Sequence, residues 1–162
     1  MATDRQRAFQ LVVEGCELGC SDCMGVAALC YIGGIGSVLT FGVCECNMEQ
    51  ALELSLKSCE HGSRYGQLAR GMLHYYQDNV DYDQAAAYFS LAAAQNLDYA
   101  YRWLGVFYEN GMGVPRDQVK ARRSFRQAAN QGLQEGMCVA LALIHSVCIV
   151  SALFTDLDAG CF

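Results

Sequence analysis

Residues 111–132 read GMGVPRDQVKARRSFRQAANQG, and this stretch decides the fold of the chain. A glycine-rich turn at 111–113 is followed by Asp117 and then by small and aromatic residues at helical spacing. Aspartate favours the position before a helix because its carboxylate accepts hydrogen bonds from the free amides of the first turn. The stretch therefore predicts a turn followed by an amphipathic helix that ends near Gly132.

The same pattern occurs three more times upstream. Each copy opens with a polar residue, and these openers are 43, 34 and 36 residues apart: Asp4, Asn47, Asp81 and Asp117. Each copy ends in a residue that tolerates the left-handed backbone common at helix ends: Gly19, Gly62, Asn96 and Gly132. Self-similarity at such a period predicts stacked helical units, each of which is a structural module without chemistry of its own.

The segments between these helices predict a partner helix for each of them, beginning just after the terminal Gly or Asn. Two positions in these segments hold mostly small residues: Cys23, Gly66, Ala100 and Gly136, then Ala28, Gly71, Gly105 and Leu141. Small side chains at these positions let neighbouring helices approach closely. The chain is therefore expected to be an all-α array of helix pairs.

The unit at 97–132 resembles the Sel1-like repeat, a relative of the tetratricopeptide repeat. The residues that carry the resemblance are Ala100, Leu104-Gly105, Tyr108, Gly111-Met112-Gly113-Val114, Asp117, Ala121, Phe125, Ala128-Ala129 and Gly132. A weaker resemblance extends over roughly residues 4–136. It implies a right-handed α-solenoid of about three and a half repeats, whose first helices line a concave face. The family consists mostly of adaptors and scaffolds, so the resemblance implies protein binding, no enzyme activity and no cofactor.

We expect residues 1–162 to form a single repeat domain. Its parts are a second helix at 1–19, repeats at 20–62, 63–96 and 97–132, and an apolar capping or docking helix with a tail at 133–162. The first repeat carries a loop insertion near 37–46, and the second lacks the Gly-x-Gly turn.

Charge is unevenly distributed along the chain. The net charge is −6, which argues against non-specific binding of nucleic acid. A basic patch nevertheless falls on the last complete helix and the turn before it: Arg116, Lys120, Arg122, Arg123 and Arg126. Two interpretations remain open, a solvated convex face and a docking patch for an acidic partner or an anionic lipid headgroup.

The chain has ten cysteines, seven of them within the first 59 residues. Cys16 and Cys59 occupy the register of Ala93 and Ala129, where cysteine serves as a small apolar residue. The alternatives are a bridge from Cys23 to Cys16 or Cys20, and a zinc site built from Cys20, Cys23, Cys44 and Cys46, although the C-x-C half fits zinc poorly. We expect no metal. No secretory signal is visible, which indicates an intracellular or organellar protein. Cysteine-rich relatives of the Sel1-like repeat are found in the mitochondrial intermembrane space, so the resemblance implies this compartment as one candidate.

Catalytic groups find little support in the sequence. No histidine (His61, His74 or His145) has both a nucleophile and an orienting carboxylate nearby in the sequence. The glycine-rich segment at 33–36 lacks the Lys and Ser/Thr of a phosphate-binding loop. We therefore predict a protein that is not an enzyme.

Residues 137–154 read MCVALALIHSVCIVSALF and carry no formal charge. The segment is apolar nearly all round, which indicates burial on more than one side. Three alternatives follow: packing against a partner subunit, folding back on the array, or crossing a membrane, for which this length is the lower limit. The expected contact residues are Val139, Leu143, Val147, Val150 and Phe154.

A second set of contact residues is expected on the concave face. These are first-helix residues outside the close-packing positions: Arg64, Gln67, His74, Arg102, Trp103 and Glu109. The preferred hypothesis is an accessory or assembly subunit that binds other protein subunits in a larger complex. If segment 137–154 crosses a membrane, that complex is membrane-associated. The other hypotheses are a soluble adaptor that holds a peptide in its groove and a cysteine-dependent redox or metal-handling assembly factor.

Overall fold

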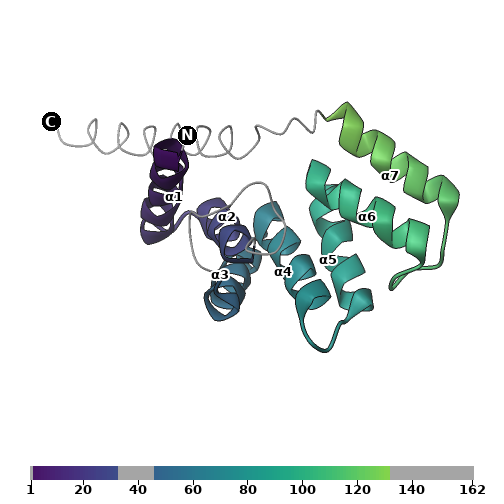
Figure 1. Cartoon of the computed structure of the whole chain (residues 1–162), viewed down its shortest axis with the longest axis horizontal. Coiled ribbons are helices and arrows are strands. Elements are labelled where there is room, and N and C mark those ends of the chain that lie inside the picture. The colour runs from purple at the N-terminus through teal and green to yellow at the C-terminus, as the bar shows by residue number, and fades with distance from the viewer. Residues whose placement is uncertain (1, 33–45, 132–162) are drawn as a thin grey trace, which may run out of the picture.

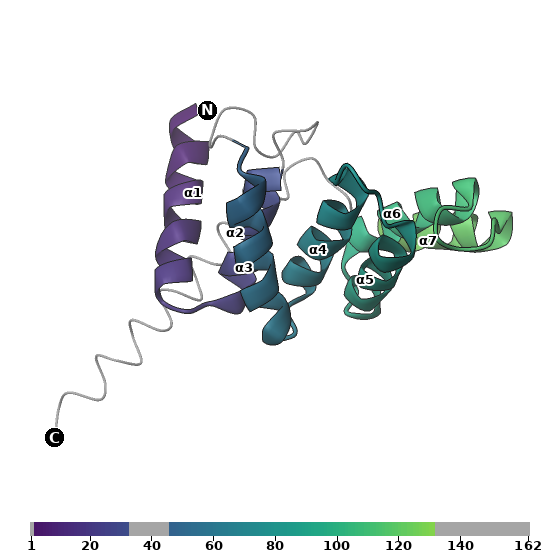
Figure 2. The same ribbon diagram turned by 90° about the horizontal axis from the view of Figure 1, so that it is seen from below.

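The computed structural model describes residues 2–32 and 46–131, and every regular element in these ranges is an α-helix. The helices are α1 (Ala2–Glu17), α2 (Ser21–Ile32), α3 (Met48–Glu60), α4 (Arg64–Tyr76), α5 (Tyr82–Ala94), α6 (Asp98–Asn110) and α7 (Gln118–Asn130). They follow one another along the long axis of the molecule in chain order (Figures 1 and 2). The predicted all-α array of helix pairs is therefore confirmed over the described residues. The apolar helix predicted at 133–162 and most of the insertion near 37–46 lie outside them.

The second helices start where the sequence predicts, with one exception. Asn47, Asp81 and Asp117 are N-caps whose side chains accept hydrogen bonds from backbone N–H groups in the first turn of α3, α5 and α7. Asp4 was expected to do the same for α1. That prediction is wrong, because α1 already begins at Ala2 and Asp4 lies within the helix.

The same closing hydrogen bond recurs in all three helix pairs. The N–H of each N-cap donates to a carbonyl oxygen near the end of the preceding helix: Asn47 to Tyr31 at 3.2 Å, Asp81 to His74 at 3.2 Å, and Asp117 to Tyr108 at 2.9 Å. The three acceptors occupy the same register, although the connecting loops differ in length. The loops therefore vary while the position of the second helix relative to the first is retained.

The left-handed helix ends are confirmed where the structure describes them. Gly19, Gly62 and Asn96 have φ of 81°, 71° and 58°, and α2, α4 and α6 begin within two residues of them. In the third pair, Gly113 (φ 59°) lies so close to the carbonyl of Tyr82 at the start of α5 that a Cβ would collide with it. The Gly-x-Gly turn thus packs against the preceding repeat.

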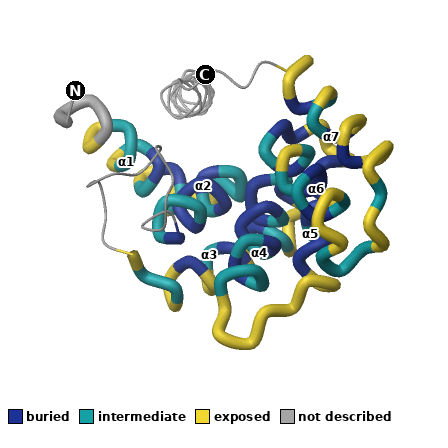
Figure 3. Tube along the Cα trace, turned by 45° about the vertical axis from the view of Figure 1, so that its right-hand side comes forward, coloured by how far each residue is buried: buried dark blue, intermediate teal, exposed yellow. Residues whose placement is uncertain are grey.

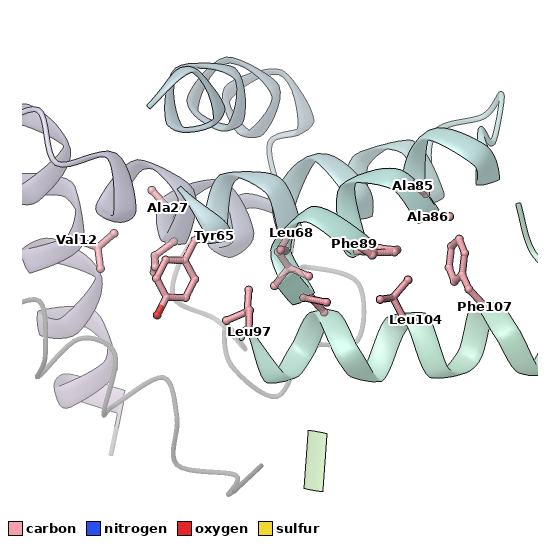
Figure 4. Packing of buried hydrophobic residues seen from close by; sticks show 14 residues of the cluster. Val12, Ala27, Tyr65, Leu68, Ala85, Ala86, Phe89, Leu97, Leu104 and Phe107 are labelled. Atoms are coloured by element: carbon pink, nitrogen blue, oxygen red, sulfur yellow. The ribbon is translucent and has the colours of Figure 1, made fainter. Parts of the chain in front are cut away.

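Figure 3 shows the burial pattern of the array, in which the first helices α2 and α4 are largely buried and much of α7 is exposed. The core lies between the first helix of one pair and the two helices of the pair before it. In Figure 4, Leu68 of α4 and Phe89 of α5 lie in one layer with Leu104 and Phe107 of α6. Burial of these side chains links one repeat to the next.

Candidate interaction surface

Of the α4 residues predicted to face a partner, two are engaged with α5. The Gln67 side-chain oxygen accepts a hydrogen bond at 2.9 Å from the Gln95 amide, which also donates to the Gly62 carbonyl. The His74 ring stacks on Tyr88, with centroids 5.5 Å apart. These two α4 side chains therefore face the neighbouring second helix.

The third predicted residue, Arg64, lies at the start of α4. Its guanidinium donates to the Tyr65 hydroxyl at 3.2 Å and sits 5.0 Å from the centre of that ring. Its side chain is half-buried. Arg64, Gln67 and His74 therefore contact three different residues, Tyr65, Gln95 and Tyr88.

Burial next to a cation disfavours protonation of His74. Its pKa is lowered, first by desolvation and then by the positive charge of Arg70, while Asp81 acts in the opposite direction. The Arg70 guanidinium lies over the same Tyr88 ring, 5.5 Å from its centre. Sequence reasoning missed this Arg70–Tyr88–His74 stack, because it joins two helices whose facing sides the periodicity alone does not resolve.

Trp103 is held by aromatic rings of the preceding repeat. It stacks on Phe89 of α5 at 5.3 Å with the planes 10° apart, and meets Tyr75 of α4 at 5.0 Å and Tyr76 at 6.3 Å. Trp103 as a whole is half-buried. Trp103, which the sequence predicts as a contact residue of the concave face, thus packs in part against the neighbouring repeat.

Arg102 and Glu109, the other predicted residues of α6, are exposed. They occupy the register of Leu68 and Tyr75 in α4, two side chains that pack toward α6. Among the described residues, no helix covers the face that carries Arg102 and Glu109, and we call this face the open edge of the array, where a following helix would stack.

The basic patch divides into two parts in the structure. Lys120 is engaged locally, since its ammonium lies 3.7 Å from the Asp117 carboxylate and 5.5 Å from the centre of the Tyr108 ring. The four arginines of the patch are exposed and form no ion pair within the described part of the chain: Arg116, Arg122, Arg123 and Arg126. The exposed charge on α7 is thus mainly guanidinium.

Three cysteines gather at the turn between α1 and α2. Burial raises the pKa of Cys16 to about 11, and desolvation together with a hydrogen bond to Cys20 raises the pKa of Cys23 further. Cys16 and Cys59 are half-buried in the register that predicted small apolar residues, and burial also raises the pKa of Cys59. Protonated thiols are weak nucleophiles and weak metal ligands, which favours the structural interpretation.

Neither a metal site nor a membrane-spanning helix is found in residues 2–32 and 46–131. No three or more His, Cys, Asp or Glu side chains in these ranges are arranged to hold a metal ion, and no helix there has the length and apolar character to cross a bilayer. Cys44 of the hypothesised zinc site lies outside these ranges. So do the predicted contact residues of the C-terminal segment, Val139, Leu143, Val147, Val150 and Phe154.

The repeat geometry agrees with a comparison to protein families. The Sel1 repeat model matches residues 23–63, 64–97 and 98–133. The chain belongs to the Sel1 repeat family. As a Sel1 repeat protein it is an α-solenoid of a class that serves as a protein–protein interaction scaffold, and the family is generally non-enzymatic.

Solved structures show the same fold. A protective antigen present in uropathogenic Escherichia coli strains, which displays an SLR fold, is 28% identical with a TM-score of 0.59 over 75% of this chain and 25% of the antigen. The chain therefore spans about a quarter of that antigen's length. A Sel1 repeat protein from Oxalobacter formigenes is 23% identical, with a TM-score of 0.56 over 78% of this chain and 91% of that protein, and shows the fold alone. Among curated proteins, none matches the chain significantly.

Proposed function

We propose that this Sel1 repeat protein is a non-enzymatic accessory or assembly subunit that docks into a larger protein complex through its apolar segment 137–154. The observation that supports this proposal is the polar character of the open edge formed by α6 and α7. That edge is the place where a further repeat helix of the same chain would stack. If it suits an apolar helix poorly, the apolar segment is left to contact another protein.

The register comparison gives the character of this edge on α6. Leu68 of α4 is 3% exposed and packs toward the next repeat, whereas its counterpart on α6 is the exposed Arg102. Tyr75 contacts Trp103, whereas its counterpart is the exposed Glu109. Covering Arg102 and Glu109 with an apolar helix would desolvate two charges without supplying hydrogen-bond partners, which is unfavourable.

The edge contributed by α7 is more exposed than the corresponding face of α5. Ala86 and Ala93 of α5 are 4% and 3% exposed, whereas their counterparts Arg122 and Ala129 are exposed. Terminal units of a solenoid commonly present a polar outer face, because nothing stacks on them. Arg102, Glu109 and Arg122 give the α6–α7 pair charged groups on this edge, whereas the sequence of segment 137–154 carries no formal charge.

The alternative hypotheses receive less support from the described residues. Trp103 is occupied by Phe89, Tyr75 and Tyr76, so a peptide groove built around it would have only part of the indole available. A redox or metal-handling role would use thiolates, whereas the pKa values of Cys16 and Cys23 are raised. A membrane contact of segment 137–154 stays an alternative outcome of the test below.

The test compares the full-length protein with a form that ends at Gly136, both expressed in cells and extracted in gentle detergent. We expect full-length protein to migrate in a large assembly and the shortened form to be released. A full-length Val139→Asp, Leu143→Asp variant should behave like the shortened form. Equal migration of all three as monomers would contradict the proposal. Release of the full-length protein by detergent, without associated protein, would assign the segment to lipid.

Trp103→Ala in the full-length protein tests the groove hypothesis in the same experiment. It should lower stability while leaving the assembly of the folded fraction intact. Loss of assembly from folded Trp103→Ala protein would favour the groove.

A further inference from the structure

The outer face of α7 carries charge that the repeat fold does not require. Arg123 and Arg126 occupy the register of Ala87 and Ser90 in α5, and of Glu53 and Leu56 in α3. All three helices form, cap and pack in the same way with these different residues. Since the fold accepts Ala, Ser, Glu or Leu at these two positions, the arginines are not explained by packing.

The arginines are also unfavourable to α7 itself. Arg122 and Arg126 are four residues apart and Arg123 and Arg126 three, so like charges lie side by side on the helix surface. Within the described residues, no carboxylate forms an ion pair with any of them. By contrast, α3 pairs its outward Glu53 with Lys57 at 2.7 Å. The α7 face thus keeps charge that nothing in the described array neutralises.

We propose that the α7 arginine face, defined as Arg123 and Arg126 with Arg122 at its border and Val119 beside them, is a docking surface for a carboxylate-rich helix or peptide of a partner protein. Guanidinium groups bind carboxylates through two parallel hydrogen bonds, which a lysine cannot reproduce. Val119 is 78% exposed and supplies an apolar contact next to the charges. Exposed apolar surface rimmed by arginine is typical of protein interfaces.

The size and setting of the face favour a protein segment over a polyanion. The three arginines span about one helical turn, roughly 6 Å along the axis, which matches two or three carboxylates and not an extended phosphate backbone. The chain as a whole is acidic, with a net charge of −6, and would be repelled by nucleic acid or a strongly anionic membrane at longer range. A short acidic segment reaches the patch without contacting the rest of the surface.

The test is binding of a fluorescent alanine-based helical peptide, about 20 residues long, that carries Glu at positions i and i+4. Full-length protein is compared with the Arg123→Glu, Arg126→Glu variant. The control variant Arg7→Glu, Lys57→Glu makes the same change in net charge on the exposed surfaces of α1 and α3. We expect about a tenfold loss of affinity for the α7 variant and little change for the control.

Two further comparisons distinguish recognition of carboxylates by guanidinium groups from non-specific attraction between opposite charges. The same peptide with Gln in place of Glu should bind poorly, and Arg123→Lys, Arg126→Lys should weaken binding although the charge is kept. Absence of binding to the Glu peptide would overturn the proposal, and so would equal losses in both charge-reversal variants. Tighter binding to phosphatidylserine vesicles or single-stranded DNA than to the Glu peptide would also overturn it. Because segment 137–154 is intact in every variant, failure here is independent of the assembly proposal.

Discussion

The α2–α4 junction and the α4–α6 junction join the same central repeat to its two neighbours by opposite means. At the first, Gly25 and Gly66 let two helices approach so closely that a Cβ on Gly25 would lie 2.5 Å from the Gly66 backbone nitrogen. At the second, the helix backbones are not closely packed, and Tyr75, Trp103 and their aromatic neighbours fill the space. One repeat fold thus accommodates both a tight backbone contact and a wide one.

Polar bridges accompany the tight junction. The buried Ser58 hydroxyl of α3 donates to the Ser21 carbonyl at 2.7 Å, and the Ser63 hydroxyl donates to the Asp22 carboxylate at 2.5 Å. Ser63 also accepts from the Tyr65 N–H as the N-cap of α4. At the wide junction, by contrast, the contacts are apolar, with aromatic rings prominent among them, and they depend on area and shape. The two junctions should therefore respond differently to added and removed volume.

The largest expected effect is loss of volume at the wide junction. Phe89 is fully buried against Trp103 and Phe107, so Phe89→Ala should lower the free energy of unfolding by about 4 kcal/mol. Chemical denaturation followed by circular dichroism measures this. The matched variant is Phe125→Ala, at the same register in the half-buried outer repeat, where about 2 kcal/mol is expected. Equal losses in the two variants would show that the contacts of Phe89 with Trp103 and Phe107 add no stability beyond that of a half-buried phenylalanine.

Added volume should matter most at the tight junction. Gly25→Ala should lower stability by about 2 kcal/mol, because the new methyl group would meet the Gly66 backbone nitrogen as well as the side chains of Tyr65 and Ser58, and a backbone cannot move aside as a single side chain can. Gly105→Ala is the matched control, since its Cβ would meet only the half-buried Phe125 ring, which can shift. Trp103 is the only tryptophan and reports the wide junction by fluorescence. If Gly25→Ala and Gly105→Ala lose equal stability, the tight junction has no special role.

The N-caps of α3 and α7 should contribute nearly the same amount to the free energy of unfolding. Asp117 accepts from both Val119 and Lys120 N–H at 3.0 Å, whereas Asn47 accepts from Gln50 N–H alone at 3.1 Å. Asp117→Ala and Asn47→Ala should each cost about 1 kcal/mol, with the larger loss at Asp117. Thermal unfolding of the two variants checks this. A much larger loss of stability at Asn47 would mean that the repeats themselves differ in stability, and not only the junctions between them.

The smallest expected effect is a pH dependence confined to the α4–α5 pair. The pKa of His74 is lowered in the folded protein, so the unfolded chain binds more protons as pH falls below the ordinary histidine value. The stability contributed by neutral His74 is therefore full above that value and is lost toward lower pH. Between pH 7.5 and 5.5, the melting temperature of His74→Gln should fall less than that of the wild type. An identical fall in both would remove His74 as a cause.

The repeat register could be predicted from the sequence because it follows from local chemistry. Asn47, Asp81 and Asp117 mark helix starts because side chains that cap helices act within one turn, and Gly62 and Asn96 mark ends because few residues adopt positive φ. The same reasoning failed at Asp4, where α1 begins earlier than the polar residue indicates. Local signals are readable because their causes lie within a few residues.

Only the tertiary structure decided which faces meet and which stay open. The periodicity assigned Gln67, His74 and Trp103 to a binding face. In the structure Gln67 is hydrogen-bonded to Gln95, the C-cap of α5, while His74 and Trp103 stack on Tyr88 and Phe89 of α5. The sequence could locate the arginines of α7 but not show that they lack ion pairs in the described array. Contacts between helices depend on distance and rotation across the whole repeat, which are set by packing and not by any single turn of chain.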